Sequence, residues 1–193
     1  MKRTLRPILW CLAIALLFAP ALAPRPEAAP RAPSFALRLL GPIASLAASV
    51  QWVRVDSAIR SGRTDIALAR AGTALEIDPG STAGWNFLAN YMALDLASRA
   101  REPDAQRRVA WIKAALAVAE RGEQSARAPS ELALWRGLIL STVVALDDEL
   151  PWPGGAAGKW NDAALSLDRA AALGDPVASE MAAIVRKRAA GVR

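Results

Sequence analysis

From residue 43 onward, apolar positions recur with the period of an α-helix, and runs typical of β-strands are nearly absent. Alanine is abundant and β-branched residues are sparse, a composition that favours helices. Glycine and proline clusters interrupt the pattern and divide it into segments. The predicted helices cover about residues 43–60, 64–77, 83–98, 102–122, 129–150, 158–173 and 177–190. The pattern therefore predicts an all-α fold.

Small residues recur at matched positions of these helices. The segment WIKAAL, which starts at Trp111, has the same layout as WNDAAL, which starts at Trp160. Further small residues follow one and two helical turns after the alanines of these copies and of an earlier one, at Ala71, Ala74, Ala119, Gly122 and Ala171. Small side chains on one face allow two helices to approach closely. The five tryptophans of the helices are predicted to pack in the core: Trp52, Trp85, Trp111, Trp135 and Trp160.

The segment ALARAGTALEIDPG at residues 67–80, followed by WNFLA at residue 85, resembles the unit of a tetratricopeptide repeat. That unit is a helix pair with an aromatic and small residues in the first helix, and alanines and a closing proline in the second. Weaker copies open at Trp52 and at Trp135, and one closes at Pro176. The positions that carry the resemblance are Ala67, Ala71, Ala74, Pro79, Trp85, Leu88, Ala89, Ala115, Ala164, Ala171 and Pro176.

The resemblance covers about residues 43–176. It implies an antiparallel helix-pair stack, an α-solenoid of about three degenerate pairs followed by a C-terminal helix. Stacks of this kind bind peptides and partner proteins. The later units are longer than the family's usual length of about 34 residues, because extra residues fall at 99–106 and at 147–158.

The N-terminus has the layout of a secretory signal. A positive flank of Lys2, Arg3 and Arg6 precedes an uncharged apolar stretch at residues 8–23. As a helix this stretch is about 24 Å long, whereas a bilayer core is about 30 Å thick, a difference that tilt can absorb. A cleaved signal peptide and a retained membrane anchor are therefore both compatible with residues 1–23. Either one places the rest of the chain on the extracytoplasmic side: at the inner membrane facing the periplasm in a Gram-negative bacterium, or secreted after cleavage.

Residues 24–42 are rich in proline and are predicted to form a linker. Its last part carries Phe35, Leu37, Leu39 and Leu40, which could contact lipid or cap the first helix; we favour the cap. Residues 43–176 form the predicted repeat domain. Residues 177–193 form a predicted C-terminal capping helix with a basic tail. The charges of the tail could complement the helix dipole or contact anionic lipid; we favour the dipole.

Composition and charge argue against several classes of function. The net charge is +6, but the excess lies at the two ends and the chain between them is mildly acidic, so no nucleic-acid partner is expected. There is no histidine, which excludes a Ser-His-Asp triad and histidine metal sites. No glycine-rich phosphate loop follows a strand. We therefore expect no enzyme activity, no cofactor, no metal and no small-molecule substrate.

Three groups are candidates for binding a partner. Trp152 lies between two prolines, in a loop that could expose it for recognition or fold it back as a lid. Asp147, Asp148 and Glu149 stand at a predicted helix C-terminus, where the dipole disfavours negative charge; they could bind a cation, face a basic partner or be solvated. Arg54 and Arg60 could bind an acidic peptide terminus or form an exposed charged stripe.

Arginines and carboxylates mix around the first insertion, and a solvated loop with local ion pairs is predicted there: Arg99, Arg101, Arg107 and Arg108. Taken together, the sequence predicts a non-catalytic, extracytoplasmic, membrane-associated helical-repeat module that acts as a scaffold or adaptor for a protein or peptide partner. The alternative is a structural subunit of a larger membrane complex, anchored by a true N-terminal transmembrane helix.

Overall fold

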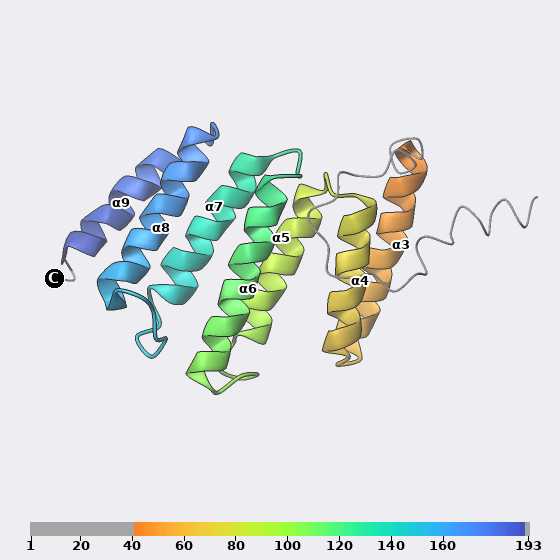
Figure 1. The fold of residues 1–193 in the computed structure, drawn as a ribbon, viewed down its shortest axis with the longest axis horizontal. Helices are drawn as coiled ribbons and strands as arrows, with labels where there is room; N and C mark the ends of the chain where they lie inside the picture. The colour runs from red at the N-terminus through yellow and green to blue at the C-terminus, as the bar shows by residue number, and fades with distance from the viewer. Residues whose placement is uncertain (1–40, 192–193) are drawn as a thin grey trace, which may run out of the picture. The chain divides into compact units, whose positions relative to one another are not determined.

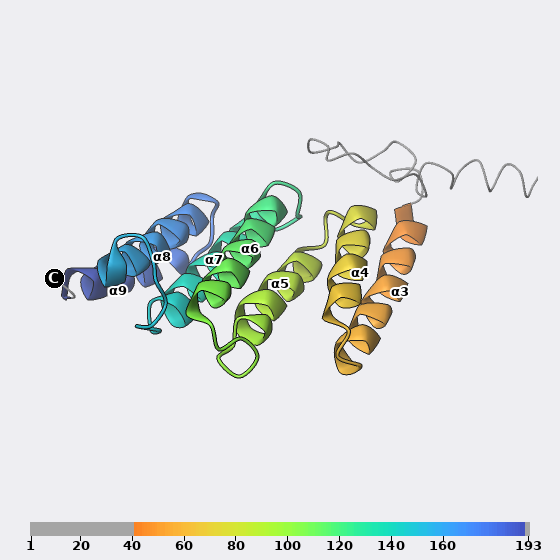
Figure 2. The same ribbon diagram turned by 60° about the horizontal axis from the view of Figure 1, so that its bottom comes forward.

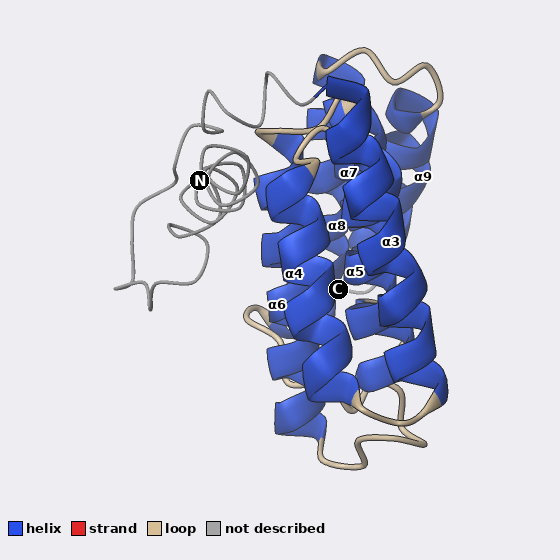
Figure 3. Ribbon diagram, turned by 90° about the vertical axis from the view of Figure 1, so that its right-hand side faces the viewer, coloured by secondary structure: helices blue, strands red, loops and turns tan. Residues whose placement is uncertain are grey.

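The computed structural model describes residues 41–191, and every regular element in that range is helical (Figure 3). The all-α prediction is confirmed for this part of the chain. The elements are α3 (Gly41–Arg60), α4 (Thr64–Ile77), α5 (Thr82–Asn90), η1 (Tyr91–Leu96), α6 (Ala105–Glu123), α7 (Pro129–Ile139), η2 (Leu140–Val144), α8 (Gly155–Ala172) and α9 (Ala178–Gly191). The elements η1 and η2 are π-helical turns that continue α5 and α7.

The helix starts follow local capping chemistry. The side chain of Ser81 accepts a hydrogen bond from the backbone N–H of Gly84 at the start of α5, as its type favours. Asp104 does the same for the N–H of Arg107 at the start of α6, at 2.8 Å. Pro129 occupies the first turn of α7, where its missing N–H costs nothing.

The helix predicted at 129–150 is too long. Its regular part ends with η2 at Val144, and residues 145–154 form turns and a loop. Carboxylates are unfavourable at a helix C-terminus, and here Asp147 and Glu149 leave the helix and bind arginines instead. The third helix, predicted over about residues 83–98, is also altered, because residues 91–96 are π-helical and the regular structure ends at Leu96.

Consecutive helices run in alternating directions and pack side by side in chain order (Figures 1 and 2). The packed neighbours are α3 with α4, α4 with α5, α5 with α6, α6 with α7, α7 with α8 and α8 with α9. In addition, α5 packs on α7. Each helix is therefore held mainly by helices close to it in the sequence.

The small residues point into these interfaces, as predicted from their spacing. Buried positions include Ala67, Ala71, Ala74, Ala115, Ala119, Gly122 and Ala164, while Ala171 is half-buried. Several glycines have no room for a side chain: an added Cβ would lie 2.7 Å from Trp52 at Gly84, 2.8 Å from Trp85 at Gly122 and 2.7 Å from Leu167 at Gly137. The interfaces are close because these positions are small.

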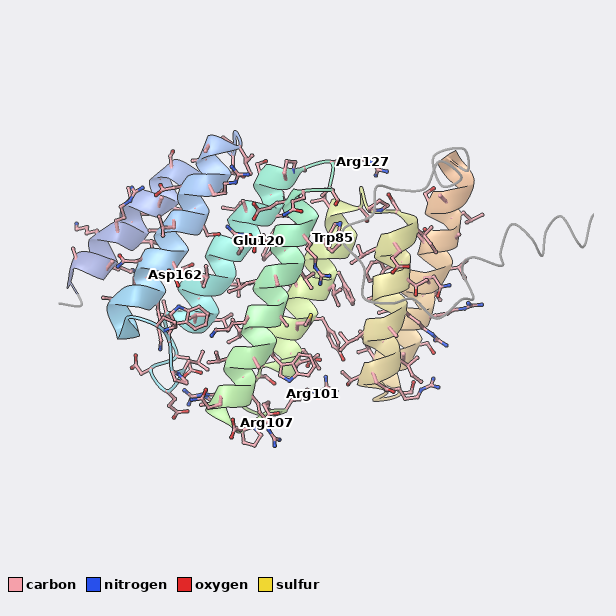
Figure 4. All side chains as sticks on the ribbon, viewed as in Figure 1. Trp85, Arg101, Arg107, Glu120, Arg127 and Asp162 are labelled. Carbon is pink, nitrogen blue, oxygen red and sulfur yellow. The ribbon has the colours of Figure 1, made fainter. Side chains whose placement is uncertain are left out.

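Large aromatic side chains fill the spaces between helices. Trp160 is buried, and Trp52, Trp85 and Trp111 are half-buried against the core, as predicted. The indole N–H of Trp85 donates to the carbonyl of Pro79 at 2.8 Å (Figure 4). Trp135, also predicted in the core, is half-buried.

Within residues 41–191, no helix combines the length and the apolar character needed to cross a bilayer. The stretch at residues 8–23, predicted as a signal or anchor, lies outside the described residues. So do the linker up to residue 40 and the last two residues of the basic tail.

Candidate functional site

The two connections in which the sequence analysis placed extra residues meet at one end of the helices. One connects η1 to α6 and the other connects η2 to α8. Arg99 in the first insertion lies 2.7 Å from Asp147 and 3.4 Å from Glu149 in the second. Two neighbours of this contact, Arg101 and Arg107, mark that end of α6 in Figure 4.

A buried arginine lies beneath this contact. Arg108, in the first turn of α6, has a side chain that is 2% exposed. Its Nη2 lies 3.3 Å from Oδ2 of Asp147 and 3.4 Å from Oε2 of Glu149, while its Nε is buried without a hydrogen-bond partner. The prediction of a solvated loop with local ion pairs is therefore wrong for Arg108, because its partners come from a distant loop and it is covered on folding.

We call this group the loop-end cluster: Arg99, Arg108, Asp147, Glu149 and Lys159. Lys159 is buried, and its ammonium donates to the backbone carbonyl of Asp147. Burial alone would raise the pKa of Asp147. Hydrogen bonds from Arg99 and from the backbone N–H of Glu149, with the charges of Arg108 and Arg99, outweigh burial and place the pKa of Asp147 below its ordinary value.

Two carboxylates of the acidic run therefore form ion pairs with arginines of the same chain. Asp147 pairs with Arg99 and Arg108, and Glu149 pairs with Arg108. Asp148 is exposed. Among the described residues there is no group of three or more acidic or cysteine side chains placed to hold a metal ion.

Trp152 is folded back onto the helices. Its ring is half-buried against the core, its indole N–H donates to Oδ2 of Asp162 at 2.8 Å, and Lys113 Nζ lies 6.0 Å from the ring centroid. Figure 4 labels Asp162 on α8. This placement corresponds to the lid alternative, since the polar atom of the indole is already engaged.

Arg54 and Arg60 are not brought together with Trp152 or the acidic run. Both lie on α3, which packs on α4. Arg60 pairs with Asp56 one turn earlier at 2.6 Å, with both side chains exposed. The carbonyl of Arg54 accepts a hydrogen bond from Arg70 at 3.1 Å. These residues form an exposed charged stripe, and such pairs contribute little to stability.

A groove that the sequence did not reveal lies between η2, α8 and α9. Its volume is about 170 Å³, and its lining is Ser141, Thr142, Leu146, Trp160, Met181, Ile184, Val185 and Arg188. Leu146 is 62% exposed and Ile184 is 52% exposed, although both are large and apolar. The guanidinium of Arg188 lies 5.6 Å from the ring centroid of Trp160. The groove therefore combines apolar walls with a cation at its rim.

No specific signal for this groove was present in the sequence. Leu146 falls at the end of the helix that was predicted too long, so its exposure could not be foreseen. Arg188 was interpreted as a charge that complements the dipole of the last helix or contacts anionic lipid, and not as part of a groove. The groove exists because η2 ends early and α9 packs across α8.

No protein-family model, curated protein or solved structure matches this chain. The side chains of the chain itself indicate what it can bind. The loop-end cluster holds two loops together, because its arginines pair with carboxylates of the same chain. The groove is suited to holding an apolar side chain next to an anionic group.

Proposed function

We propose that this chain is a non-catalytic, tetratricopeptide-like helical-repeat module that binds a protein or peptide partner. Its small residues at matched positions, its close interfaces and its packing in chain order support an α-solenoid of degenerate helix pairs. The apolar stretch at residues 8–23 supports attachment to a membrane, with the helices on the extracytoplasmic side.

The observation that carries the proposal is the pair of exposed apolar side chains on the groove. Leu146 and Ile184 leave more than half of their surface in water, next to the buried ring of Trp160. Clustered apolar surface of this kind is typical of sites that bind another molecule. The volume of about 170 Å³ is below the range of about 300–1,000 Å³ for small-molecule pockets. It fits one or two side chains of a partner better than a metabolite.

The groove also indicates the chemistry of the partner segment. An apolar side chain would bury itself between Leu146 and Ile184, over Trp160. A neighbouring Asp, Glu or terminal carboxylate would face Arg188, and the hydroxyls of Ser141 and Thr142 lie on the same lining. The expected ligand is an apolar segment with a negative charge beside it.

The test compares the wild-type chain with Ile184→Glu and Leu165→Glu in quantitative affinity purification from solubilised membranes. Leu165 is the matched control, because it is 66% exposed on α8 but does not line the groove. We expect a protein that the wild type and Leu165→Glu retain equally and that Ile184→Glu retains at least about tenfold less, about 1.4 kcal/mol of binding. Equal recovery by all three, or recovery of no protein by the wild type, would contradict the proposal.

A further inference from the structure

The last described helix, α9, carries an exposed stripe that combines apolar and charged side chains. We call this stripe the α9 face, and its members are Val177, Glu180, Ile184, Lys187 and Arg188, all of them exposed. Their spacing places them on one side of the helix. The other side of α9 carries its buried alanines and valine and packs on α8.

The α9 face borders the groove between η2, α8 and α9. Ile184 and Arg188 belong to the face and also line the groove, and the exposed Leu146 lines the groove with them. In Figure 1, α9 stands at one end of the row of helices, and α8 is the helix on which it packs. A protein that docks on the α9 face would therefore reach the groove as well.

The charges of the α9 face are not paired within the described part of the chain. Arg186, on another side of α9, forms an ion pair with Asp168 of α8. Within residues 41–191, Glu180, Lys187 and Arg188 form no ion pair. The helix dipole favours a carboxylate at the start of α9 and cations at its end, but it leaves these exposed groups able to bind a partner.

The order of the residues makes the α9 face complementary to itself. Glu180 comes four residues before Ile184 and Arg188 four residues after it, so each charge lies about 6 Å from Ile184 along the helix axis. If a second α9 runs in the opposite direction with Ile184 on Ile184, Glu180 of each copy lies beside Arg188 of the other. Two equal ion pairs then flank an apolar centre, as a two-fold symmetric interface requires.

The same helix also matches the ligand expected for the groove. That ligand is an apolar segment with a negative charge beside it. On α9, Ile184 is the apolar side chain, and Glu180 lies one helical turn before it. A second copy of this chain therefore offers both chemical groups at the spacing that the groove and Arg188 need.

We propose that two copies of this chain pair through their α9 faces in antiparallel orientation. Ile184 lies at the two-fold axis, beside Leu146 of the other copy, and Glu180 of each copy binds Arg188 of the other. The inference rests on the proposed function, because it names a second copy as the protein that the groove binds. A single pair of 14-residue helices makes a small interface, below about 1,200 Å², so we expect a dissociation constant of about 1–100 μM.

Charge reversal tests this pairing in the full-length chain, with copies that carry two different tags. Glu180→Arg and Arg188→Glu should each lower self-association at least about tenfold, because each variant places like charges opposite each other. Mixed together, the two variants should associate as the wild type does, since every cation then faces a carboxylate of the other copy. Leu165→Glu, outside the groove, is the control and should self-associate normally. A mixture that does not associate would overturn the proposal.

Cysteine cross-linking tests the position of the two-fold axis. Cys11 is the only cysteine, so Cys11→Ser provides a clean background. In that background, Ile184→Cys should form a disulfide between two chains in mild oxidant at least about tenfold faster than Ser179→Cys. Ser179 is exposed on the same helix but lies on another side of it. Equal rates for the two variants would indicate random collision and would also overturn the proposal.

Two outcomes separate this inference from the proposed function. The wild type could stay monomeric up to about 100 μM while Ile184→Glu still loses a different protein from solubilised membranes. The inference would then be wrong, and the proposed function would stand. Alternatively, Arg188→Glu could weaken binding to phosphatidylcholine–phosphatidylglycerol vesicles while the mixed variants fail to associate. The α9 face would then contact anionic lipid, and the pairing of two copies would be wrong.

Discussion

Arg108 and Asp147 lie 3.3 Å apart, although they come from two separate insertions and the Arg108 side chain is only 2% exposed. Asp147 is also bound by Arg99 at 2.7 Å, and Lys159 donates to its backbone carbonyl. One carboxylate thus joins the η1–α6 connection to the η2–α8 connection. These ion pairs hold the two connections together.

The first prediction concerns Arg108. Arg108→Met removes the buried guanidinium and leaves Asp147 and Glu149 facing the vacated space. We expect the free energy of unfolding to fall by about 2–3 kcal/mol, less than for a fully buried pair because the carboxylates keep access to water. Urea denaturation followed by circular dichroism measures this. Arg107→Met, at the exposed neighbouring position, is the control and should change little. Equal midpoints for the two variants would show that Arg108 contributes no more than a surface side chain.

The second prediction concerns the pH dependence of the same site. The pKa of Asp147 is lower in the folded chain than its ordinary value. Such a carboxylate stabilises the fold above the unfolded pKa of about 3.9 and loses this contribution as the pH falls through its folded pKa. We therefore expect the wild type to be more stable than Asp147→Asn at pH 7, with the difference shrinking in acid below about pH 4. If the difference in unfolding free energy between the wild type and Asp147→Asn stayed constant with pH, it would contradict the lowered pKa of Asp147.

Glu123 should behave in the opposite way. Burial raises its pKa more than the charges of Arg136 and Arg169 lower it. Arg136 Nη1 lies 3.1 Å from Oε1, which has no well-aligned hydrogen bond. The ionised form is therefore disfavoured by folding, and its cost grows as the pH rises above the unfolded pKa of about 4.3. Relative to Glu123→Gln, the wild type should lose stability between about pH 4 and pH 7. Chemical denaturation at several pH values in this range measures the free energy of unfolding of both proteins. If the wild type instead gained stability relative to Glu123→Gln as the pH rises, the prediction would be wrong.

The helix boundaries could be predicted because most of them are set by residues at the boundary itself. Gly62, the Asp78-Pro79-Gly80 turn and Pro129 end or begin helices through their own backbone preferences. The small interface residues were also predictable, because their spacing places them on one face. The contact of Arg108 with Asp147 was not, because it depends on how two distant connections meet in space.

The groove escaped prediction for a related reason. Leu146 and Ile184 are ordinary apolar residues within helical patterns, and only the early end of η2 leaves them exposed together. The position of Trp152 could be predicted only in part. Its loop was predicted, but its position against the helices was not, because it depends on Asp162, which lies in the following helix and accepts a hydrogen bond from the indole.

The close helix interfaces lead to a paired prediction for two glycines. At Gly137 an added Cβ would lie 2.7 Å from the Leu167 side chain and 3.3 Å from its backbone nitrogen, so Gly137→Ala should destabilise the fold by about 1–3 kcal/mol. At Gly72, in α4, nothing lies within 4 Å of the added Cβ. Gly72→Ala should therefore stabilise it by about 0.5–1 kcal/mol through helix propensity. Thermal unfolding of both variants separates the effects, and a shift in the same direction for both would contradict the packing at Gly137.

The last prediction decides the role of Trp152. Because its ring packs against the core and its N–H is bound to Asp162, Trp152→Phe should cost about 1 kcal/mol for the lost hydrogen bond. Trp152→Ala should cost about 2–3 kcal/mol, because it also removes a half-buried ring. At about 2–4 °C of melting temperature per kcal/mol, both losses are measurable. Asp162→Leu in the Trp152→Phe background should add little, since the bond is already absent. A recognition residue would behave differently: Trp152→Ala would weaken partner capture while leaving the melting temperature unchanged, and that result would overturn the lid.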